Sequence, residues 1–167
     1  MKKGYLSTVE LQKENMKFSA GHTTIFSATE REPLHGHHYT VYLGLTTWVE
    51  ENGMTFDYRY YKNKIREYCD FLNQTFLMPG CSPYLQQEED EAYYYFTFNH
   101  KKIPFLKEDV TILPVTNITL EELSRWFVMA LIKDQTELEK HRVEKLVVKV
   151  FSAPGQSASH TWKRESL

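Results

Sequence analysis

The sequence has few cysteines and no long apolar run, and each absence narrows the class of protein. Its two cysteines, Cys69 and Cys81, are too few for a disulfide framework, so we expect free thiols in a reducing cytoplasm. We expect Cys69 in the core of a helix and Cys81 in a loop. No apolar stretch approaches the roughly 20 residues that span a bilayer, which argues against a membrane protein. Two lysines near the N-terminus precede no apolar segment, so we expect no signal peptide.

The sequence also lacks an excess of charge of either sign. Its 20 basic and 22 acidic residues nearly cancel, so nothing in the charge favours binding to nucleic acid or to an anionic membrane. At 167 residues the chain has the length of one domain with a sizeable core. We therefore expect a single cytoplasmic domain over residues 1–167.

Histidines are concentrated in the motif Leu34-His35-Gly36-His37-His38. In an extended segment His35 and His37 point the same way, and Gly36 between them lets another backbone approach closely. A hairpin with the segment before it would bring His22 to the same place. Three imidazoles with one open position are typical of a catalytic zinc site. A bare pair of histidines on a strand often binds nothing. The motif alone therefore leaves open whether these histidines form a metal site or bind nothing.

Hydrophobic periodicity predicts strands and helices along the whole chain. Residues 16–24 and 38–49 are predicted strands, and the second places Val41, Leu43, Leu45 and Thr47 on one face. The segment from a cap at Asp57 to about Phe76 is predicted as a helix. A second helix is predicted from a capping box of Thr119 and Glu122 to about Leu138. The remaining predicted strands cover residues 145–151 and 158–164, and an aromatic hairpin is expected over residues 92–105.

The predicted order gives an α+β fold in which two helices cover one face of an antiparallel four-stranded sheet. A loop and hairpin over about residues 80–112 are inserted into it. We expect the aromatic hairpin to pack on the body or on a neighbouring subunit, because no basic patch supports a base-stacking role. A small sheet with free edges needs cover, which oligomerisation supplies, so we expect a homo-oligomer.

Several blocks of the sequence together resemble the 6-pyruvoyl-tetrahydropterin synthase / 6-carboxytetrahydropterin synthase family. They occur in family order and extend from about residue 16 to the C-terminus. The blocks are FSAGH (18–22), REPLHGHHY (31–39), GMTFDY (53–58), LPVTNITLEEL (113–123) and VKVFSAPGQSA (148–158). The resemblance implies a tunnelling fold, in which sheets join edge to edge into oligomeric barrels, and a lyase that acts on a pterin.

The same resemblance implies roles for individual residues. His22, His35 and His37 match the family's zinc ligands. Glu32 stands where one branch of the family has a glutamate in place of the usual cysteine, a branch associated with cleaving the side chain of dihydroneopterin triphosphate. A carboxylate near zinc is a reasonable general base. The alternative interpretation is a loop glutamate that faces water.

Three positions in two blocks depart from the family pattern. Asn73 and Gln74 replace an Asp-His dyad of the catalytic site, and an amide cannot titrate near neutral pH. Ser152 replaces a glutamate that anchors the pterin ring, and a hydroxyl cannot accept two parallel N–H bonds as a carboxylate does. Thr119 and Glu121, in the block that begins the second helix, are the other expected substrate-binding residues.

These departures leave three functions open. The first is a zinc-dependent lyase on a dihydroneopterin triphosphate-type pterin, with Glu32 as the base. The second is a non-catalytic or repurposed protein that keeps the zinc site and binds another small molecule. The third is an enzyme for a different, carbonyl-bearing substrate that uses His160 or Asp70 in place of the dyad.

Overall fold

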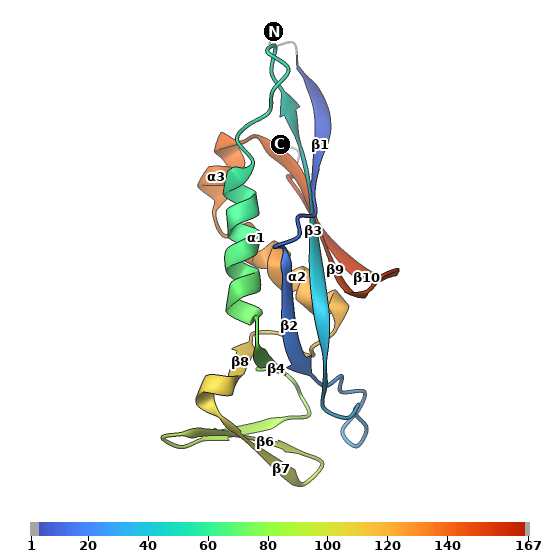
Figure 1. Cartoon of the computed structure of the whole chain (residues 1–167), viewed down its shortest axis with the longest axis vertical. Helices are drawn as coiled ribbons and strands as arrows, with labels where there is room; N and C mark the ends of the chain where they lie inside the picture. Colours follow the sequence, from blue (N-terminus) through green and yellow to red (C-terminus); the bar gives the residue numbers. More distant parts are fainter. Residues whose placement is uncertain (1–3, 166–167) are drawn as a thin grey trace.

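The computed structural model describes residues 4–165, and its main body is one curved, mixed sheet of seven strands (Figure 1). The strand order is β10-β9-β3-β2-β4-β8, and β1 also pairs with β3. The strands are β1 (Tyr5–Leu11), β2 (Lys17–His22), β3 (His35–Val49), β4 (Thr75–Pro79), β8 (Val110–Leu113), β9 (Val143–Ala153) and β10 (Gln156–Lys163). Residues 1–3 lie outside the described residues. They begin the N-terminal segment in which we expect no signal peptide.

The 15-residue strand β3 is the centre of this sheet. Its first part pairs antiparallel with β2 and its second part with β1, while β9 runs along its other edge. The predicted inward face of β3 is confirmed, because Val41, Leu43 and Leu45 are completely buried and Thr47 is nearly so. These branched side chains suit a pleated surface that is buried on one side, and they form the centre of the hydrophobic core.

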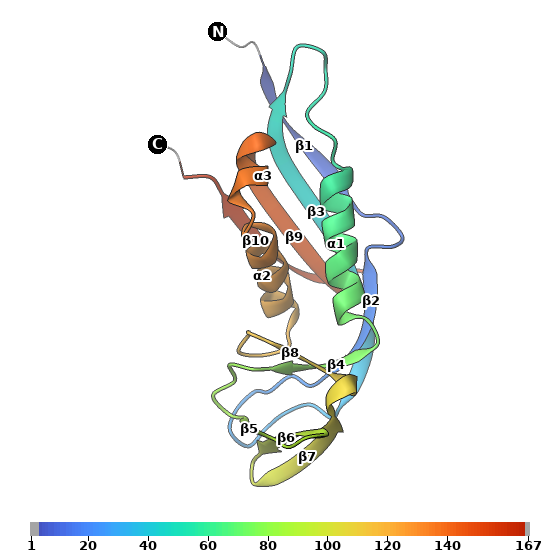
Figure 2. The same cartoon turned by 90° about the vertical axis from the view of Figure 1, so that its left-hand side faces the viewer.

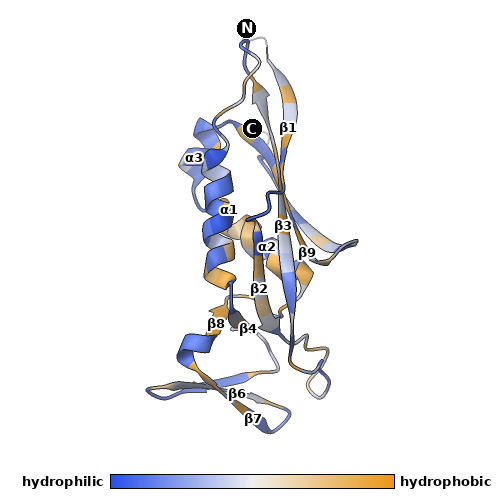
Figure 3. Cartoon of the chain, viewed as in Figure 1, coloured by the Kyte–Doolittle hydropathy of each residue, from blue (hydrophilic) through white to orange (hydrophobic). Residues whose placement is uncertain are grey.

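Two helices, α1 (Arg59–Leu72) and α2 (Leu120–Leu131), cover one face of the sheet (Figure 2). Figure 3 shows α1 as mostly hydrophilic and α2 as mostly hydrophobic. Accordingly α1 buries a single stripe, which consists of Tyr61, Ile65, Cys69 and Leu72. The short helix α3 (Gln135–Lys140) follows α2. No helix within residues 4–165 is long and apolar enough to cross a membrane.

The inserted segment forms a separate three-stranded sheet at one end of the molecule (Figures 1 and 2). It consists of β5 (Gln86–Glu89), β6 (Tyr93–Phe98) and β7 (Lys101–Leu106), and a short 3-10 helix, η1 (Lys107–Asp109), leads from it into β8. The predicted aromatic hairpin is confirmed as β6 and β7, and β5 extends it. Asn99 and His100 form its turn with positive φ angles of 45° and 63°.

The predicted four-stranded antiparallel sheet is wrong in number and in direction. The structure adds β1, β4 and β8, and β4 runs parallel to both β2 and β8. The strands β4 and β8 have five and four residues, too short to show a clear alternation of apolar and polar residues. The α+β class and the two large helices on one face stand.

The predicted helix ends are also wrong. The first helix ends at Leu72 rather than near Phe76, because Gln74 has a φ of 59° that no right-handed helix accommodates. The second ends at Leu131, and the Asp134 carboxylate then accepts the Glu137 N–H and caps a new helix. The cap at Thr119 is confirmed, as are the buried Cys69 and the exposed Cys81. The helix α1 begins one residue later than a cap at Asp57 predicts, but the Asp57 carboxylate does accept the N–H of Arg59, the first residue of α1, at 3.0 Å.

Candidate metal centre

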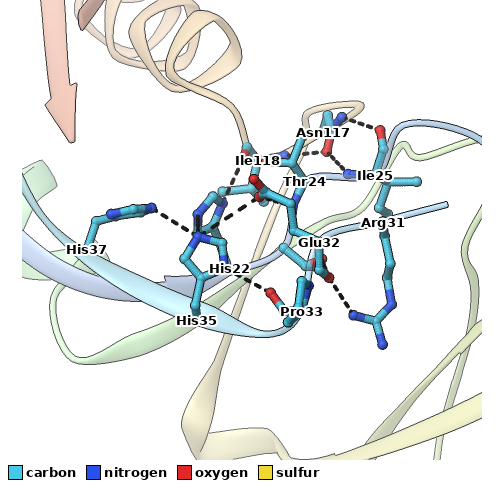
Figure 4. Close-up of polar contacts among 11 residues, drawn as sticks. His22, Thr24, Ile25, Arg31, Glu32, Pro33, His35, His37, Asn117 and Ile118 are labelled. Carbon is cyan, nitrogen blue, oxygen red and sulfur yellow. Dashed lines mark hydrogen bonds and ion pairs between the residues drawn. The ribbon is translucent and has the colours of Figure 1, made fainter. Parts of the chain in front are cut away.

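Three histidines from the paired strands β2 and β3 converge on one point (Figure 4). The β2–β3 register sets His22 opposite His35 and Ala20 opposite His37, so all three imidazoles project from the same face. The Nε2 atom of His35 lies 3.1 Å from the Nε2 atoms of both His22 and His37. The structure thus brings together the three residues that the sequence predicts as metal ligands.

Backbone carbonyls hold two of these imidazoles in one tautomer. The Nδ1 atom of His22 lies 2.9 Å from the carbonyl oxygen of Ile118, and the Nδ1 atom of His35 lies 2.8 Å from that of Pro33. Because a carbonyl only accepts, each Nδ1 carries the proton, and in the neutral ring Nε2 is left with a free lone pair. Two lone pairs therefore face each other across 3.1 Å between His22 and His35, an arrangement that a bound cation stabilises.

The geometry fits a tetrahedral zinc ion. Zinc–nitrogen bonds of about 2.0–2.1 Å in a tetrahedron place the ligand nitrogens roughly 3.3 Å apart, close to the 3.1 Å observed for two of the pairs. Carbonyl acceptors on the second ring nitrogens are the usual outer partners of ligating histidines. His22, His35 and His37 can accordingly hold a metal such as zinc and leave one position for water or a ligand.

Two glycines allow the strands to approach closely beneath the histidines. Gly36 pairs with Gly21 in the β2–β3 register, and a Cβ at Gly36 would lie 2.9 Å from the carbonyl oxygen of Ala20. A Cβ at Gly21 would lie only 2.4 Å from the ring of Phe76. The expectation that Gly36 permits a close backbone approach is confirmed, and Gly21 has the same role toward β4.

Glu32 lies beside the histidines at the end of the loop that joins β2 and β3. Its Oε2 atom is 3.9 Å from the Nε2 atom of His35 and accepts a hydrogen bond of 3.2 Å from the backbone N–H of Thr24. Hydrogen bonds from Thr24 lower the pKa of the Glu32 carboxyl group, with smaller contributions from His35 and His22. The carboxylate therefore stays ionised at neutral pH and faces the ligand atoms rather than only water.

Burial and repulsion by the neighbouring imidazoles lower the pKa of His22 and of His37 and so favour their neutral forms. Burial is the largest cause that lowers the pKa of His22, and His35 and His37 lower it further, while the hydrogen bond to Ile118 opposes both. The pKa of His37 is lowered by burial and by His35. A neutral imidazole is the form that binds a metal.

A cavity of about 300 Å³ opens in front of these groups, the lower end of the range for small-molecule sites. The cavity includes the predicted substrate-binding residues Thr119, Glu121 and Ser152. Its lining comprises His22, Thr24, Glu32, His37, Tyr39, Ile118, Thr119, Leu120, Glu121, Ser152 and Gln156. The carboxylates among these are Glu32 and Glu121, so they are the groups able to accept paired N–H donors.

Asn73 and Gln74, the predicted positions of the replaced dyad, do not line this cavity. Both are exposed. The side-chain oxygen of Asn73 accepts the backbone N–H of Ser19 at 2.9 Å, and Gln74 lines a different hollow that also includes Ser19 and His38. Asn73 thus supports the start of β2. Neither Asp70 nor His160 lines the histidine cavity.

Sequence patterns gave no sign of the groups that orient the site. Asn117 lies just before α2, and its side chain accepts the N–H of Ile25 at 3.1 Å and donates to the Ile25 carbonyl at 2.8 Å (Figure 4). This pair of hydrogen bonds ties the β2–β3 loop to the segment whose Ile118 carbonyl orients His22. These hydrogen bonds join a side chain to the backbone of a residue 92 positions away, and no local sequence pattern contains such a contact.

A histidine tripod on two antiparallel strands, with a carboxylate and a small polar cavity beside it, defines a candidate metal-dependent enzyme or binding protein. The family follows from the sequence match: residues 10–162 match the family described as 6-pyruvoyl tetrahydropterin synthase. The chain belongs to the 6-pyruvoyl tetrahydropterin synthase family.

Individual relatives agree with this assignment. A Methanocaldococcus jannaschii protein, provisionally named a 6-carboxy-5,6,7,8-tetrahydropterin synthase, is 24% identical over 148 residues, which cover 87% of this chain and 89% of that protein. The 6-pyruvoyl tetrahydropterin synthase of Plasmodium vivax is 26% identical with a TM-score of 0.90, covering 96% and 99% of the two chains. A mutant of that enzyme in which a catalytic glutamate is replaced by alanine is 25% identical, with the same TM-score and coverage.

Proposed function

We propose that this protein is a zinc-dependent 6-pyruvoyl-tetrahydropterin synthase-like lyase that acts on a dihydroneopterin triphosphate-type pterin. The observation that carries the proposal is the convergence of three imidazole nitrogens and the Glu32 carboxylate beside one small cavity. The family assignment and the catalytic glutamate of the Plasmodium vivax enzyme support it.

Different residues of the chain would bind the metal, recognise the substrate and transfer the proton. His22, His35 and His37 would hold the zinc ion through Nε2. The ion supplies Lewis acidity toward an oxygen of the substrate side chain. Glu32, 3.9 Å from the Nε2 atom of His35, would then accept the proton of the adjacent C–H group.

Other residues that line the cavity would bind the pterin ring. Ser152 cannot make the paired acceptor contact expected of a glutamate, but Glu121 lines the same cavity. A carboxylate accepts two parallel N–H bonds from a planar partner. We assign Glu121 this contact, and Ser152 and Thr119 hydrogen bonds at the edge of the ring.

The test is turnover of dihydroneopterin triphosphate by zinc-loaded protein, followed by chromatography of the pterin products. We expect turnover by the wild type and a loss of about 100-fold or more in kcat for Glu32→Gln, with the zinc content unchanged. A wild-type protein that leaves this substrate intact refutes the proposed reaction. A Glu32→Gln variant with wild-type kcat refutes the role of Glu32.

A second candidate is a zinc-bearing protein that binds a small molecule without transforming it. The observation that favours it is the position of Asn73 and Gln74, two groups that cannot titrate and that lie outside the cavity. Native mass spectrometry of the purified protein tests this candidate. A pterin that is retained and recovered unchanged supports binding alone, and release of a transformed pterin excludes it.

We also propose that the protein is a cytoplasmic homo-oligomer. Support comes from β10, which ends the strand order and whose outer edge pairs with no strand among residues 4–165. An open strand edge of this kind favours pairing with another chain. Light scattering during gel filtration tests the oligomer, and a monomeric mass would refute it.

A further inference from the structure

The three-stranded sheet β5–β7 contacts residues next to the metal centre through two aromatic side chains that face the body of the protein. One is Phe98, the last residue of β6, and the other is Phe105 of β7. Phe98 contacts Arg31, which directly precedes Glu32. Phe105 contacts Phe76, which occupies the space above Gly21 beside His22. The contacts suggest a role for this sheet beyond covering the end of the molecule.

Phe98 contacts the site through Arg31. The Phe98 side chain is only 6% exposed, and the guanidinium carbon of Arg31 lies 5.6 Å from the centre of its ring. This is a cation–π contact, which holds a guanidinium over an aromatic face. The Nη1 atom of Arg31 donates a hydrogen bond of 2.7 Å to the backbone carbonyl of Glu32 (Figure 4).

The backbone of Glu32 is therefore held from several sides. Its carbonyl also accepts the hydroxyl of Thr23 at 2.7 Å, and its N–H donates to the carbonyl of Thr24 at 2.9 Å. Arg31, Thr23 and Thr24 all belong to the β2–β3 loop, and the Arg31 side chain also contacts the β5–β7 sheet through Phe98. Phe98 is thus the point at which the inserted sheet restrains the carboxylate loop.

Phe105 supports the other half of the site. Its ring lies 4.9 Å from that of Phe76 on β4, and Phe76 occupies the space above Gly21, directly before His22. This contact acts on β2, which carries a metal ligand, and not on Glu32. The two aromatic contacts can therefore be tested separately.

We propose that the β5–β7 sheet positions Glu32 for proton transfer, with Phe98 and Arg31 as positioning residues. The inference rests on the proposed function for its catalytic consequence, although the positioning itself can be observed without turnover. Misplacement of a reacting group by about 1 Å can cost 100-fold in rate. When the contact of Arg31 is lost, the Glu32 carbonyl loses one of its two hydrogen bonds and the loop samples more positions.

The experiment compares Phe98→Leu and Arg31→Gln with the wild type as zinc-loaded full-length protein. Tyr93→Leu is the matched control, because Tyr93 lies on the same strand and its side chain is 39% exposed. Phe98→Tyr keeps the aromatic face and serves as the rescue variant. Three quantities are measured for each protein: the zinc content, amide hydrogen exchange of residues 23–34, and the separate values of kcat and KM.

We expect faster exchange over residues 23–34 in Phe98→Leu and Arg31→Gln, with the zinc content unchanged. The value of kcat should fall by about tenfold or more, while KM changes by less than about threefold. Phe98→Tyr and Tyr93→Leu should resemble the wild type in every measurement. Because Arg31 is a loop residue, Arg31→Gln remains informative if Phe98→Leu does not fold.

Three results would overturn the inference. The first is unchanged exchange over residues 23–34 in both variants, and the second is an equal effect of Tyr93→Leu. The third is loss of zinc from Phe98→Leu or Arg31→Gln, which would mean that the contact maintains the whole site. If the wild type does not turn over the pterin, the proposed function fails, and the exchange data still decide whether Phe98 and Arg31 restrain the loop.

Discussion

Replacing Gly36 with alanine should weaken zinc binding, because the added methyl group meets backbone that cannot rotate away. The new Cβ would lie 2.9 Å from the carbonyl oxygen of Ala20 and 3.6 Å from the Cα atom of Gly21. Ordinary carbon–oxygen contacts are about 3.3 Å or longer, so β2 and β3 must separate by roughly 0.4 Å. Metal–ligand distances tolerate about 0.2 Å, and His22 lies on one of these strands while His35 and His37 lie on the other.

We expect the zinc dissociation constant of Gly36→Ala to rise by about 10–100-fold, which corresponds to about 1.4–2.7 kcal/mol. The measurement is competition with a chromogenic chelator of known affinity, with the melting temperature recorded in parallel. Gly44→Ala is the control on the same strand, since its Cβ would meet the Tyr42 hydroxyl at 3.0 Å, the end of a side chain that can move. A zinc affinity of Gly36→Ala within about twofold of the wild type would refute the reasoning, because a tenfold loss is the least that we expect.

Two further substitutions test a residue that lines the cavity and a residue that holds the β2–β3 loop beside it. Glu121→Gln should raise KM for a pterin by about tenfold or more with little change in kcat, because a neutral amide replaces a carboxylate that accepts paired N–H bonds; steady-state kinetics measure this, and an unchanged KM excludes the contact. Asn117→Ala removes two hydrogen bonds to Ile25 and should lower the free energy of unfolding by about 1–3 kcal/mol. Urea denaturation of the zinc-free protein measures that change, and a loss below about 0.5 kcal/mol would show that water replaces Asn117.

The convergence of the three candidate metal ligands could be predicted because their arrangement follows from local rules. His35 and His37 share a face in any regular strand, and a hairpin between the two predicted strands brings His22 beside them, as the register confirms. The cap at Thr119 is equally local, since its hydroxyl accepts the N–H of Glu122. Such features depend on a few neighbouring residues.

The parts of the fold that the sequence patterns did not predict depend on contacts between distant segments. Strand β4 pairs with β2 through only two residue positions and with β8 through four, and parallel pairs of this kind carry no turn signal between them. The first helix ends where Gln74 takes a left-handed conformation and its N–H donates to the Ser19 carbonyl. That bond belongs to the tertiary structure, and the apolar periodicity that continues to Phe76 gave no indication of it.

Within the site, the functional residues themselves could be predicted more readily than the contacts that hold them in place. Glu32 was identified from its place before the His-Gly-His motif, and it lies 3.9 Å from His35. The Arg31–Phe98 contact and the Asn117–Ile25 pair join segments 67 and 92 residues apart. No period of 2 or 3.6 residues encodes such contacts, so only the folded chain reveals them.

The central claim is that His22, His35 and His37 hold one zinc ion, and elemental analysis of protein expressed with added zinc tests it most directly. We expect about one equivalent of zinc per chain in the wild type and almost none in a His35→Ala/His37→Ala double variant that keeps its circular dichroism spectrum. The sheet and helices supply the core of that variant, so it should fold. Less than about half an equivalent in the wild type, or full zinc retention by the double variant, would contradict the account.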